Sequence, residues 1–353
     1  MKEILSKYKN ILITGGAGFI GKNLIIKLLK DYSYNILNID KIGYASDLYG
    51  INNNLKKLKS DCYEFLKIDL INKSETIKAI NKFKPDLVFH LAAESHVDRS
   101  INNPVSFIES NILGTFNLLE ALREYWSELD SRKQKSFKFV HISTDEVYGS
   151  LGNSGLFNEN SQYDPRSPYS ASKASSDHLV KAWHNTFHFP AVVVNCSNNF
   201  GPWQYPEKLI PLTILNALNG IDIPLYGNGE NIRDWLFVED HVEALILIAS
   251  KGISGESYCI GGDNQISNKN LVLKICEELE LLRPAKYKYK DLIKYVKDRP
   301  GHDFRYAIDS SKMKSSFQWK SRYDFQKSLK KTILWYIDNE NWVKNLLHKN
   351  ISR

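Results

Sequence analysis

A chain of 353 residues, 42% apolar and 12% aromatic, can build a large hydrophobic core, which indicates one large or two modest domains. Its net charge of +7 comes from lysines scattered along the sequence. The pairs Lys56–Lys57 and Lys330–Lys331 are short and isolated, so a nucleic-acid surface is not indicated and we expect no nucleic-acid partner. A modest positive field suits an anionic small molecule equally well.

The four cysteines, Cys62, Cys196, Cys259 and Cys276, are far apart and show no paired spacing. They indicate neither a metal site nor a disulfide framework, and they fit a reducing compartment. The segment "MKEILSKYKN" carries charges where a signal peptide needs its apolar stretch, and no apolar run reaches the length of a membrane span. We therefore expect a cytoplasmic protein with no metal and no membrane partner.

The first expected element, within "NILITGGAGFIGKNLIIKLLK" (10–30), is a short strand that turns through glycines into a helix. Further strands are expected at 34–40, 63–70 and 86–93, the last of them after a polar helical stretch. A helix over 103–126 has Asn103 as its cap and Pro104 at its first position.

The apolar run "FKFVHIS" (137–143) predicts the next strand, which leads to two adjacent carboxylates. A helix from about Pro168 and a strand at 190–196 follow. Strands that alternate with helices indicate an α/β protein with a doubly wound parallel sheet. Beyond about Cys196, loops rich in Asn, Gly and Pro interrupt short apolar segments. They predict a smaller, irregular domain that covers the ligand end of the sheet.

Three glycines, Gly15, Gly18 and Gly21, form a G-x-x-G-x-x-G pattern between the first strand and its helix. Such glycines let the chain turn tightly and bring backbone amides close to a pyrophosphate at a helix N-terminus. A glycine pattern alone often marks only a tight turn, but the position between strand and helix makes a dinucleotide site credible. Asp40, which ends the second strand, is placed to bind ribose hydroxyls. An acid there repels a 2′-phosphate and favours NAD over NADP.

Three further residues bear on the cofactor. Lys41 follows Asp40 and is the one feature that points toward NADP. Asp69 and Leu70 end the third strand, where they either meet the adenine or are solvated loop residues.

Tyr169 and Lys173 lie four residues apart in "SPYSASK", a spacing that puts both on one face of the helix. An ammonium beside a phenol, with a positive nicotinamide nearby, lowers the tyrosine pKa from its usual value of about 10. The tyrosine can then accept a hydroxyl proton while hydride leaves for the cofactor. By itself the spacing is common and often marks surface pairing, but after a dinucleotide fold it is more specific.

The adjacent carboxylates are Asp145 and Glu146 in "ISTDEVYG" (142–149). Consecutive strand residues point to opposite faces, so the two can share one task only if the strand stops there. A solvated turn is the plainest interpretation of such a pair. Two close carboxylates in one site instead split their pKa values, and one of them stays protonated.

Recognisable motifs follow one another along nearly the whole chain: "TGGAGFIG", Asp40–Lys41, "LAAESHVDRS" (91–100), "STDEVYG", "YSASK", "NNFGP", "PEKLIP", "IRDWLFVEDH" and "RPGHD". The sequence resembles the extended short-chain dehydrogenase/reductase superfamily and, within it, the dTDP-glucose 4,6-dehydratase family, whose distinguishing triplet is Thr144-Asp145-Glu146. Phe304, after "RPGHD", stands where that family often has a basic residue.

The resemblance implies a Rossmann-type NAD-binding domain over 1–197. It also implies a smaller mixed domain over 198–353, mainly for a sugar nucleotide, with some segments returning to the first domain. NAD is implied as a tightly held cofactor that is recycled in each turnover. The implied substrate is dTDP-glucose, and the sequence leaves UDP-glucose open because a thymine methyl needs only a small apolar contact.

The resemblance also assigns roles to residues. It implies Asp145 as the acid, Glu146 as the base at carbon 5, Tyr169 with Lys173 as the oxidation pair, and Thr144 as a ligand of the reacting oxygen. The implied cofactor-binding set is Gly15, Gly18, Phe19, Ile20, Gly21, Asp40, Lys41, Asp69, Leu70, Ala92, Ala93, Ser95, Tyr169, Lys173 and Asn199. The implied substrate-binding set is Ser95, Thr144, Asn198, Lys208, Leu209, Tyr226, Arg233, Asn264, Arg299 and His302.

Other functions share this fold and remain alternatives. A nucleotide-sugar 4-epimerase needs only oxidation and reduction at carbon 4, so it needs no dedicated acid and base. A UDP-glucuronate decarboxylase has no carbon 6 hydroxyl to expel. A non-catalytic NAD-binding regulator has no physical need for Tyr169, Lys173, Asp145 and Glu146 together. The fold alone does not separate these functions, so the site residues must.

A homodimer is the expected assembly. Apolar residues recur along the 103–126 helix and the Tyr169 helix: Ile108, Ile112, Phe116, Leu119, Leu122, Leu179, Val180 and Trp183. The resemblance implies that two such helices from each subunit form a four-helix interface. The alternative is that both apolar stripes face the protein's own sheet.

Overall fold

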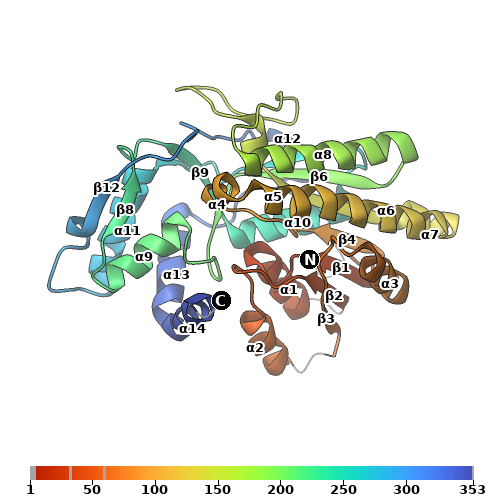
Figure 1. The fold of residues 1–353 in the computed structure, drawn as a ribbon, viewed down its shortest axis with the longest axis horizontal. Helices are drawn as coiled ribbons and strands as arrows, with labels where there is room; N and C mark the ends of the chain where they lie inside the picture. Colours follow the sequence, from red (N-terminus) through yellow and green to blue (C-terminus); the bar gives the residue numbers. More distant parts are fainter. Residues whose placement is uncertain (1–4, 32–33, 59–60, 352–353) are drawn as a thin grey trace.

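A seven-stranded parallel sheet is the centre of the computed structural model, which describes residues 5–31, 34–58 and 61–351 (Figure 1). Its strands, in spatial order, are β10 (Ser257–Ile260), β6 (Ala191–Cys196), β5 (Lys138–Thr144), β4 (Leu87–His90), β1 (Asn10–Thr14), β2 (Asn35–Asp40) and β3 (Tyr63–Lys67). The first six strands along the chain have the order of a Rossmann fold. The predicted doubly wound α/β sheet is confirmed.

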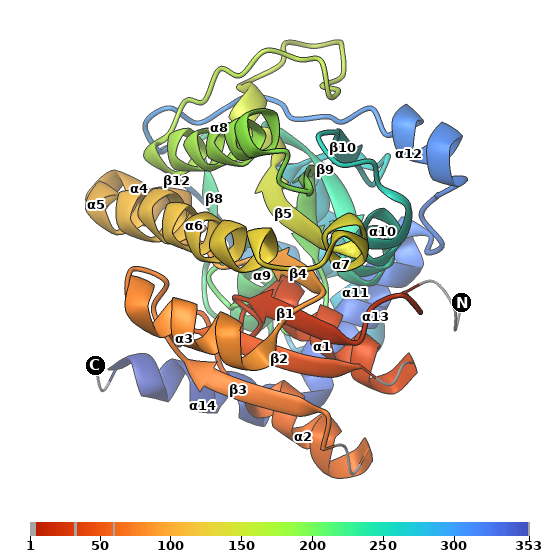
Figure 2. The same ribbon diagram turned by 90° about the vertical axis from the view of Figure 1, so that its right-hand side faces the viewer.

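Helices cover both faces of this sheet (Figure 2). On one face lie α1 (Phe19–Asp31) and α10 (Val238–Lys251); on the other lie α3 (Lys73–Phe83), α6 (Gly114–Ser127) and α8 (Pro168–Phe187). The strands serve both faces because successive side chains point in opposite directions. In β1, Ile11 and Ile13 join the core under α1 and α10, whereas Leu12 joins the core under α3, α6 and α8.

The helix expected at 103–126 is interrupted. It begins with α5 (Pro104–Phe107), continues as a π-helical segment at Ile108–Leu113 and ends as α6. Asn103 occupies the N-cap position and Pro104 the first turn, as predicted, but the side chain of Asn103 makes no capping hydrogen bond. A π-helical segment has no signature in hydrophobic periodicity, and such segments are frequent at functional sites.

Short helices that the sequence analysis did not predict lie between the main elements. They are α2 (Tyr49–Leu58), α4 (Val97–Asn102) and α7 (Ser131–Ser136). The α2 helix follows the loop after β2 and packs against α1. Its central "INNN" run has little helical propensity, which explains why the pattern alone did not indicate it.

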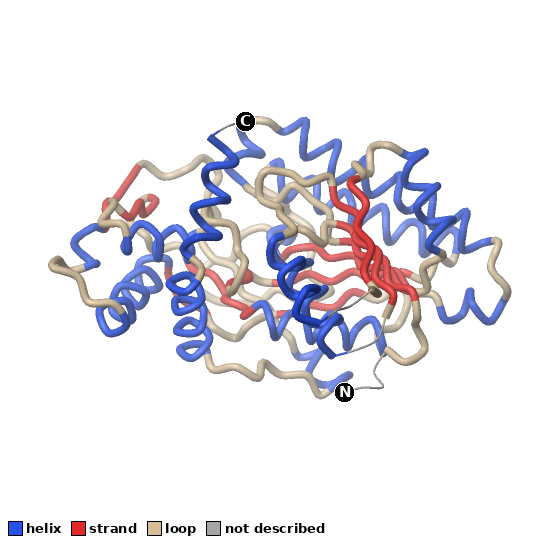
Figure 3. Tube along the Cα trace, turned by 90° about the horizontal axis from the view of Figure 1, so that it is seen from below, coloured by secondary structure: helices blue, strands red, loops and turns tan. Residues whose placement is uncertain are grey.

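The second part of the chain forms two small sheets at one end of the molecule (Figures 1 and 3). One is a mixed sheet of β11 (Gln265–Ser267), β9 (Ile232–Phe237) and β7 (Asn198–Phe200), and the other pairs β12 (Ile293–Val296) with β8 (Ile223–Tyr226) in parallel. Its helices are α9 (Leu209–Leu218), α11 (Asn268–Leu282), the 3₁₀ turn Tyr289–Leu292, α13 (Phe325–Asp338) and α14 (Glu340–Ile351). The helix α12 (Ser311–Phe317) packs instead against β10 of the large sheet.

A buried lysine joins the start of the large sheet to the end of the described chain. Lys22, in α1, is 1% exposed, and its Nζ lies 2.5 Å from the Asp47 carboxylate. The same Nζ lies 5.2 Å from the ring centre of Trp203 and 5.5 Å from that of Trp342. Trp335 packs on Trp203 with ring centres 4.6 Å apart. Two tryptophan rings thus lie against the lysine of the ion pair, an arrangement in which the rings attract the cation, and Trp335 packs against both rings.

Two expected absences concern only the part of the chain that the structure describes. None of its helices is long and apolar enough to cross a membrane. No group of three or more His, Cys, Asp or Glu residues within that part could hold a metal ion. Cys196, Cys259 and Cys276 are buried free thiols. The first four residues of the charged N-terminal segment lie outside the described ranges.

The glycine turn generates a first test. A Cβ added to Gly21 would lie 2.5 Å from the carbonyl oxygen of Gly15 and 2.7 Å from the Cα of Gly16, both of which are backbone atoms. Gly21→Ala should therefore lower the free energy of unfolding by about 1–3 kcal/mol, although alanine normally favours a helix over glycine by about 1 kcal/mol. Chemical denaturation followed by circular dichroism measures the change.

Gly152→Ala is the matched control for this test, because a Cβ at Gly152 meets nothing within 4 Å. We expect its free energy of unfolding to stay within about 1 kcal/mol of that of the unmodified protein. A Gly21→Ala variant as stable as the control would contradict the packing argument.

Candidate active site

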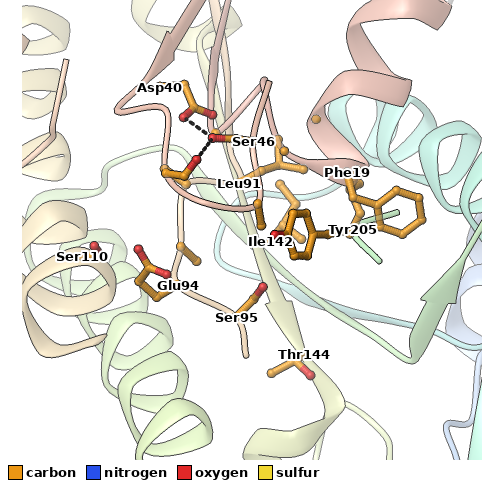
Figure 4. A pocket seen from close by; sticks show the side chains of 18 of the residues that line it. Phe19, Asp40, Ser46, Leu91, Glu94, Ser95, Ser110, Ile142, Thr144 and Tyr205 are labelled. Atoms are coloured by element: carbon orange, nitrogen blue, oxygen red, sulfur yellow. Dashed lines mark hydrogen bonds between the residues drawn. The ribbon is translucent and has the colours of Figure 1, made fainter. Parts of the chain in front are cut away.

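A cleft runs along the carboxyl ends of the parallel strands, between the large sheet and the loop that precedes α9 (Figure 4). Its walls come from the glycine turn, the loops after β2, β3 and β4, the end of β5, the start of α8 and residues 196–208. All fifteen residues expected to bind the cofactor line this one cleft. They meet because parallel strands end at the same edge of a sheet, where such folds bind their ligands.

The glycine turn brings backbone close to backbone at one end of the cleft. Gly15 has φ of +71°, and a Cβ there would lie 2.5 Å from the backbone nitrogen of Ala92. Only glycine fits this position, on both conformational and steric grounds. Phe19, Ile20 and Gly21 line the cleft at the N-terminus of α1. A helix N-terminus without bulky side chains before it is suited to an anionic phosphate group.

Asp40 is held rigidly at the end of β2. Its carboxylate accepts hydrogen bonds from the backbone nitrogens of Ala17 (3.0 Å) and Ile42 (2.8 Å) and from the Ser46 hydroxyl (3.4 Å) (Figure 4). Burial raises the pKa of this carboxyl, and the two backbone hydrogen bonds oppose the rise. The sequence pattern identified Asp40 but not Ala17 or Ser46, which position it.

Lys41, which pointed toward a 2′-phosphate, is already paired. Its Nζ lies 2.8 Å from the Glu94 carboxylate and 2.6 Å from the Ser110 hydroxyl oxygen. Glu94 follows β4, and Ser110 belongs to the π-helical segment. Because this contact depends on strand order and on an irregular helix, no local pattern could have revealed it. The positive charge next to Asp40 is therefore partly neutralised within the protein.

The π-helical segment also fixes the loop after β4. The side-chain oxygen of Asn111 accepts from the backbone nitrogen of Glu94 (2.8 Å), and its Nδ2 donates to the Glu94 carbonyl (3.0 Å) and to the Ser172 hydroxyl (2.8 Å). The buried Asn111 side chain thus links this loop to α8. Sequence analysis missed this residue.

Tyr169 and Lys173 start α8 side by side and are both buried. The Ser167–Ser170 capping box and Pro168 begin the helix. Lys173 Nζ donates to the carbonyl of Ile142 at 2.8 Å. Burial, followed by the negative charge of Glu146, raises the pKa of Tyr169 well above its usual value. The expected lowering depends on the positive charges of Lys173 and of a bound nicotinamide, so for the complex with NAD it stays a prediction.

The carboxylate pair lies where β5 stops. Thr144 is the last strand residue, and Asp145–Tyr148 form a 3₁₀ turn that Thr144 caps by accepting from the backbone nitrogen of Glu146 at 3.2 Å. Because β5 ends at Thr144, Asp145 and Glu146 are not held on opposite faces of the sheet, so the two carboxyls can share one task. Glu146 lines the cleft, whereas Asp145 is 1% exposed and accepts from the Thr144 hydroxyl at 3.3 Å. Asp145 is buried and Glu146 is half-buried in the wall of the cleft, so the pair is not a solvated turn.

The two carboxyls differ in their charged neighbours. Burial raises the pKa of Asp145 well above its usual value, and the charges of Glu146 and Asp234 raise it further. Burial also raises the pKa of Glu146, but Arg299, Arg233 and Lys208 oppose this rise. The environment therefore favours a protonated Asp145 beside an ionised Glu146, although the protons of so close a pair belong to both groups.

The expected substrate residues divide into two groups. Ser95, Thr144, Asn198 and Lys208 line the same cleft as the cofactor residues, and Lys208 Nζ donates to the Ser95 carbonyl at 3.0 Å. The others lie beyond it in the second part of the chain: Leu209, Tyr226, Arg233, Asn264, Arg299 and His302.

Two arginines of the second group act on Glu146 through their charge. Arg233 is 5% exposed, and its guanidinium donates to the carbonyls of Ile232 (2.8 Å) and Asp303 (2.9 Å). Arg299 lies 3.4 Å from the Asp98 carboxylate. Most donors of Arg233 are used within the protein, so this guanidinium is held in a fixed position.

Three other members of the second group also have internal partners. The Tyr226 hydroxyl donates to Asp98 at 3.2 Å, and His302 Nδ1 lies 2.6 Å from Asp298. The ring centres of Tyr226 and His302 are 6.2 Å apart. Asn264 donates to the Gly262 carbonyl at 2.5 Å, which directs its amide into a local turn.

A cluster absent from the sequence predictions spans the mouth of the cleft. The Tyr44 hydroxyl donates to the Glu207 carboxylate at 2.8 Å, and Arg99 Nε lies 3.4 Å from the same carboxylate. The Arg99 guanidinium lies 3.6 Å from the centre of the Tyr44 ring. This cluster connects the loop after β2 to the segment before α9. No single segment contains a signal for it.

The fold and this set of residues are those of an extended short-chain dehydrogenase/reductase. A family model described as GDP-mannose 4,6 dehydratase matches residues 12–332. The dTDP-glucose 4,6-dehydratase of Neisseria meningitidis is 49% identical over 345 residues, which cover 96% of each chain. This chain belongs to the dTDP-glucose 4,6-dehydratase family.

Solved structures agree with this assignment. The dTDP-glucose 4,6-dehydratase of Bacillus anthracis, solved in complex with NAD, has a TM-score of 0.83 and 43% identity over 96% of this chain and 99% of that one. The dTDP-glucose 4,6-dehydratase of Streptomyces venezuelae, solved with NAD and TYD, has a TM-score of 0.86 and 35% identity over 95% and 99%.

Proposed function

We propose that this chain is an NAD-dependent hydro-lyase that converts dTDP-glucose to dTDP-4-keto-6-deoxyglucose and water. The observation that carries the proposal is the Asp145–Glu146 pair at the end of β5, with Asp145 buried and Glu146 lining the cleft, beside the buried Tyr169 and Lys173 of α8. Relatives 49% identical over nearly the full length bear the name of this enzyme.

The cleft fits NAD. Gly15 and Gly21 leave no room for a Cβ where a pyrophosphate would approach the N-terminus of α1. Asp40 offers a fixed carboxylate for the ribose hydroxyls, and the pairing of Lys41 with Glu94 weakens the attraction for a 2′-phosphate. When bound, NAD supplies the acceptor for hydride from carbon 4 and the donor of hydride to carbon 6.

Tyr169 acts as the base of the first step by accepting the proton of the carbon 4 hydroxyl. Its raised pKa means that a positive charge must stabilise the phenolate. Lys173, one helical turn away, supplies that charge from within the protein, and Thr144 holds the reacting oxygen.

Oxidation at carbon 4 makes the hydrogen on carbon 5 acidic, and the carboxylate pair then carries out the elimination. Glu146, held toward its ionised form by Lys208, Arg233 and Arg299, removes the carbon 5 proton. Asp145, held toward its protonated form by burial and by Glu146, donates a proton to the departing carbon 6 hydroxyl. One group must be charged and the other neutral at the same pH, and their different surroundings support that division.

The substrate is assigned to the remaining part of the cleft and the residues beyond it. Lys208, Arg233 and Arg299 hold the diphosphate. Lys208 acts as a point charge, and a guanidinium group can bind two phosphate oxygens at once. The other contacts are assigned to Ser95, Asn198, Leu209, Tyr226, Asn264 and His302. We retain 1–197 as the cofactor domain and 198–353 as mainly the substrate domain, with β10 as a strand of the large sheet and α10 packed against that sheet.

The alternatives fit less well. A 4-epimerase has no use for the acid and base that Asp145 and Glu146 provide, and a decarboxylase substrate has no carbon 6 hydroxyl. A non-catalytic NAD-binding protein would have no reason to bury four ionisable groups beside its cofactor, because burying charge is costly. UDP-glucose remains the competing substrate, and direct assay separates it from dTDP-glucose.

A product assay tests the function as a whole. Purified protein incubated with dTDP-glucose should form the 4-keto-6-deoxy sugar in amounts well above the NAD present, because hydride returns to the substrate in each turnover. Parallel incubation with UDP-glucose should give less product. Consumption of NAD one-for-one, or turnover only with NADP, would contradict the proposal.

Variants of the carboxylate pair test the division of roles. Glu146→Gln should lose both exchange of the carbon 5 hydrogen with solvent deuterium and dehydration. Asp145→Asn should still oxidise carbon 4, while water loss slows by about 10²–10⁴-fold, the usual contribution of a positioned acid. Tyr169→Phe should form neither reduced cofactor nor exchanged substrate. Mass spectrometry of recovered substrate and product measures all three.

Glu64→Gln is the matched control, because this surface carboxylate pairs with Lys82 and does not line the cleft. It should behave as the unmodified protein. Dehydration at the unmodified rate by both Asp145→Asn and Glu146→Gln would refute the assigned roles.

We also propose a cytoplasmic homodimer. Cysteines without paired spacing and a nucleotide-sugar substrate suit the cytoplasm. In the helices expected to form the interface, Leu119, Leu122 and Val180 pack into the protein's own core. In the first part of the expected 103–126 helix, α5 and the π-helical segment instead leave Val105 60%, Ile108 50% and Leu113 41% exposed. This apolar surface, and not the whole predicted stripe, is what a second copy would cover.

The dimer proposal predicts the effect of charge on this surface. The double variant Val105→Asp, Ile108→Asp should sediment as a monomer at micromolar concentration, because an apolar interface cannot bury two unpaired carboxylates. Leu281→Asp, at a residue 78% exposed on α11, is the control and should remain dimeric. An unmodified protein that sediments only as a monomer would rule out the dimer.

A further inference from the structure

The α8 helix carries a third buried ionisable residue behind Tyr169 and Lys173. Asp177 follows Lys173 by one helical turn, so the three residues form a row along one face of the helix. Asp177 is 0% exposed. It does not line the cleft. A buried carboxylate is costly unless it is paired and hydrogen-bonded, so its partners indicate its purpose.

Both oxygens of Asp177 have polar neighbours from several elements. Oδ2 accepts from the Ser143 hydroxyl (2.8 Å), the Tyr163 hydroxyl (3.0 Å) and Asn195 Nδ2 (3.3 Å). Oδ1 lies 3.1 Å from His141 Nε2. Three of these neighbours lie in β5 and β6, and Tyr163 belongs to the loop before α8. The carboxylate is therefore fixed in position and is not a flexible surface acid.

Two basic side chains act on Asp177: His141, whose Nε2 is close to it, and Lys173, one helical turn back on α8. Burial lowers the pKa of His141 to about 4 and that of His90 well below its usual value, so both imidazoles are neutral. Burial raises the pKa of the Cys196 thiol to about 12. Lys181, further along α8, donates to the Tyr163 hydroxyl at 3.3 Å. Burial lowers the pKa of Lys173, and the charge of Asp177 opposes that fall.

Asp177 is also connected to the end of β5. Asn195 Nδ2, which donates to Asp177, lies 3.1 Å from the carbonyl of Thr144 and donates to it as well. Ser143, the other strand partner, directly precedes Thr144 in the chain. One carboxylate thus contacts the strand that carries the acid–base pair and the helix that carries the oxidation pair.

We propose that Asp177 is a positioning residue for the oxidation step, acting through Lys173: its buried carboxylate keeps the lysine ammonium charged beside Tyr169. The proposal rests on the function proposed above. Without Asp177, Lys173 loses its proton at lower pH, the phenolate loses its stabilising charge, and oxidation slows. The sign follows from linkage: a cation whose counter-charge is removed titrates at lower pH.

The test is the pH profile of oxidation in single turnovers, followed by the absorbance of reduced nicotinamide and expressed per bound NAD. In Asp177→Asn the alkaline limb of the profile, where the oxidation rate falls as pH rises, should shift to lower pH by about one unit or more. At a fixed pH on that limb this shift corresponds to at least about a tenfold loss of rate. Asp177→Ser, which is also uncharged, should show the same shift. Asp177→Glu, which keeps the charge, should restore the limb toward its original position.

Tyr163→Phe is the matched control, because it removes one hydrogen bond from Asp177 and leaves the charge. Its alkaline limb should not move. An unshifted limb in both uncharged variants overturns the proposal, and so does misfolding of both uncharged variants while Asp177→Glu folds, which would make the role structural. Failure of the unmodified protein to oxidise dTDP-glucose at all would instead overturn the proposed function.

Discussion

The exclusion of water from the point where β5 meets α8 is the constraint on which the site depends. The parallel sheet brings the ends of its strands to one edge, and the second part of the chain covers that edge. Asp145, Tyr169 and Lys173 are nearly inaccessible there. In a medium of low dielectric each charge acts over a longer range than in water. The protonation of each group is therefore decided by its neighbours.

Burial alone would leave these groups unsuited to the chemistry. It raises the pKa of Tyr169, Asp145 and Glu146 and lowers that of Lys173, so it favours the neutral form of all four. For Asp145 that tendency is useful, since an acid must hold its proton. For the others it must be opposed, and the structure places arginines near Glu146 and a carboxylate behind Lys173. The counter-charges are thus as much a part of the site as the reacting groups.

The sequence predicted those parts of the molecule that local patterns encode. Alternating strands and helices, the turn at Gly15 and the spacing of Tyr169 and Lys173 each lie within one segment, and the structure has the expected fold. The π-helical segment, the Lys41–Glu94 pair and the partners of Asp177 could not be predicted in this way. Each depends on which strands are neighbours, or on an irregular backbone. The burial that raises the pKa of Tyr169 is likewise a property that no local pattern reveals.

The enclosed ion pair of Lys22 and Asp47 has a consequence for how the chain folds during synthesis. The lysine belongs to the helix that follows the glycine turn, yet one of the rings against it is Trp342, close to the end of the described chain. Until that residue leaves the ribosome, the lysine of the nascent helix lacks part of its apolar enclosure. Domains generally fold as units during synthesis. Here the first βα unit reaches its final environment only after Trp342 has been synthesised.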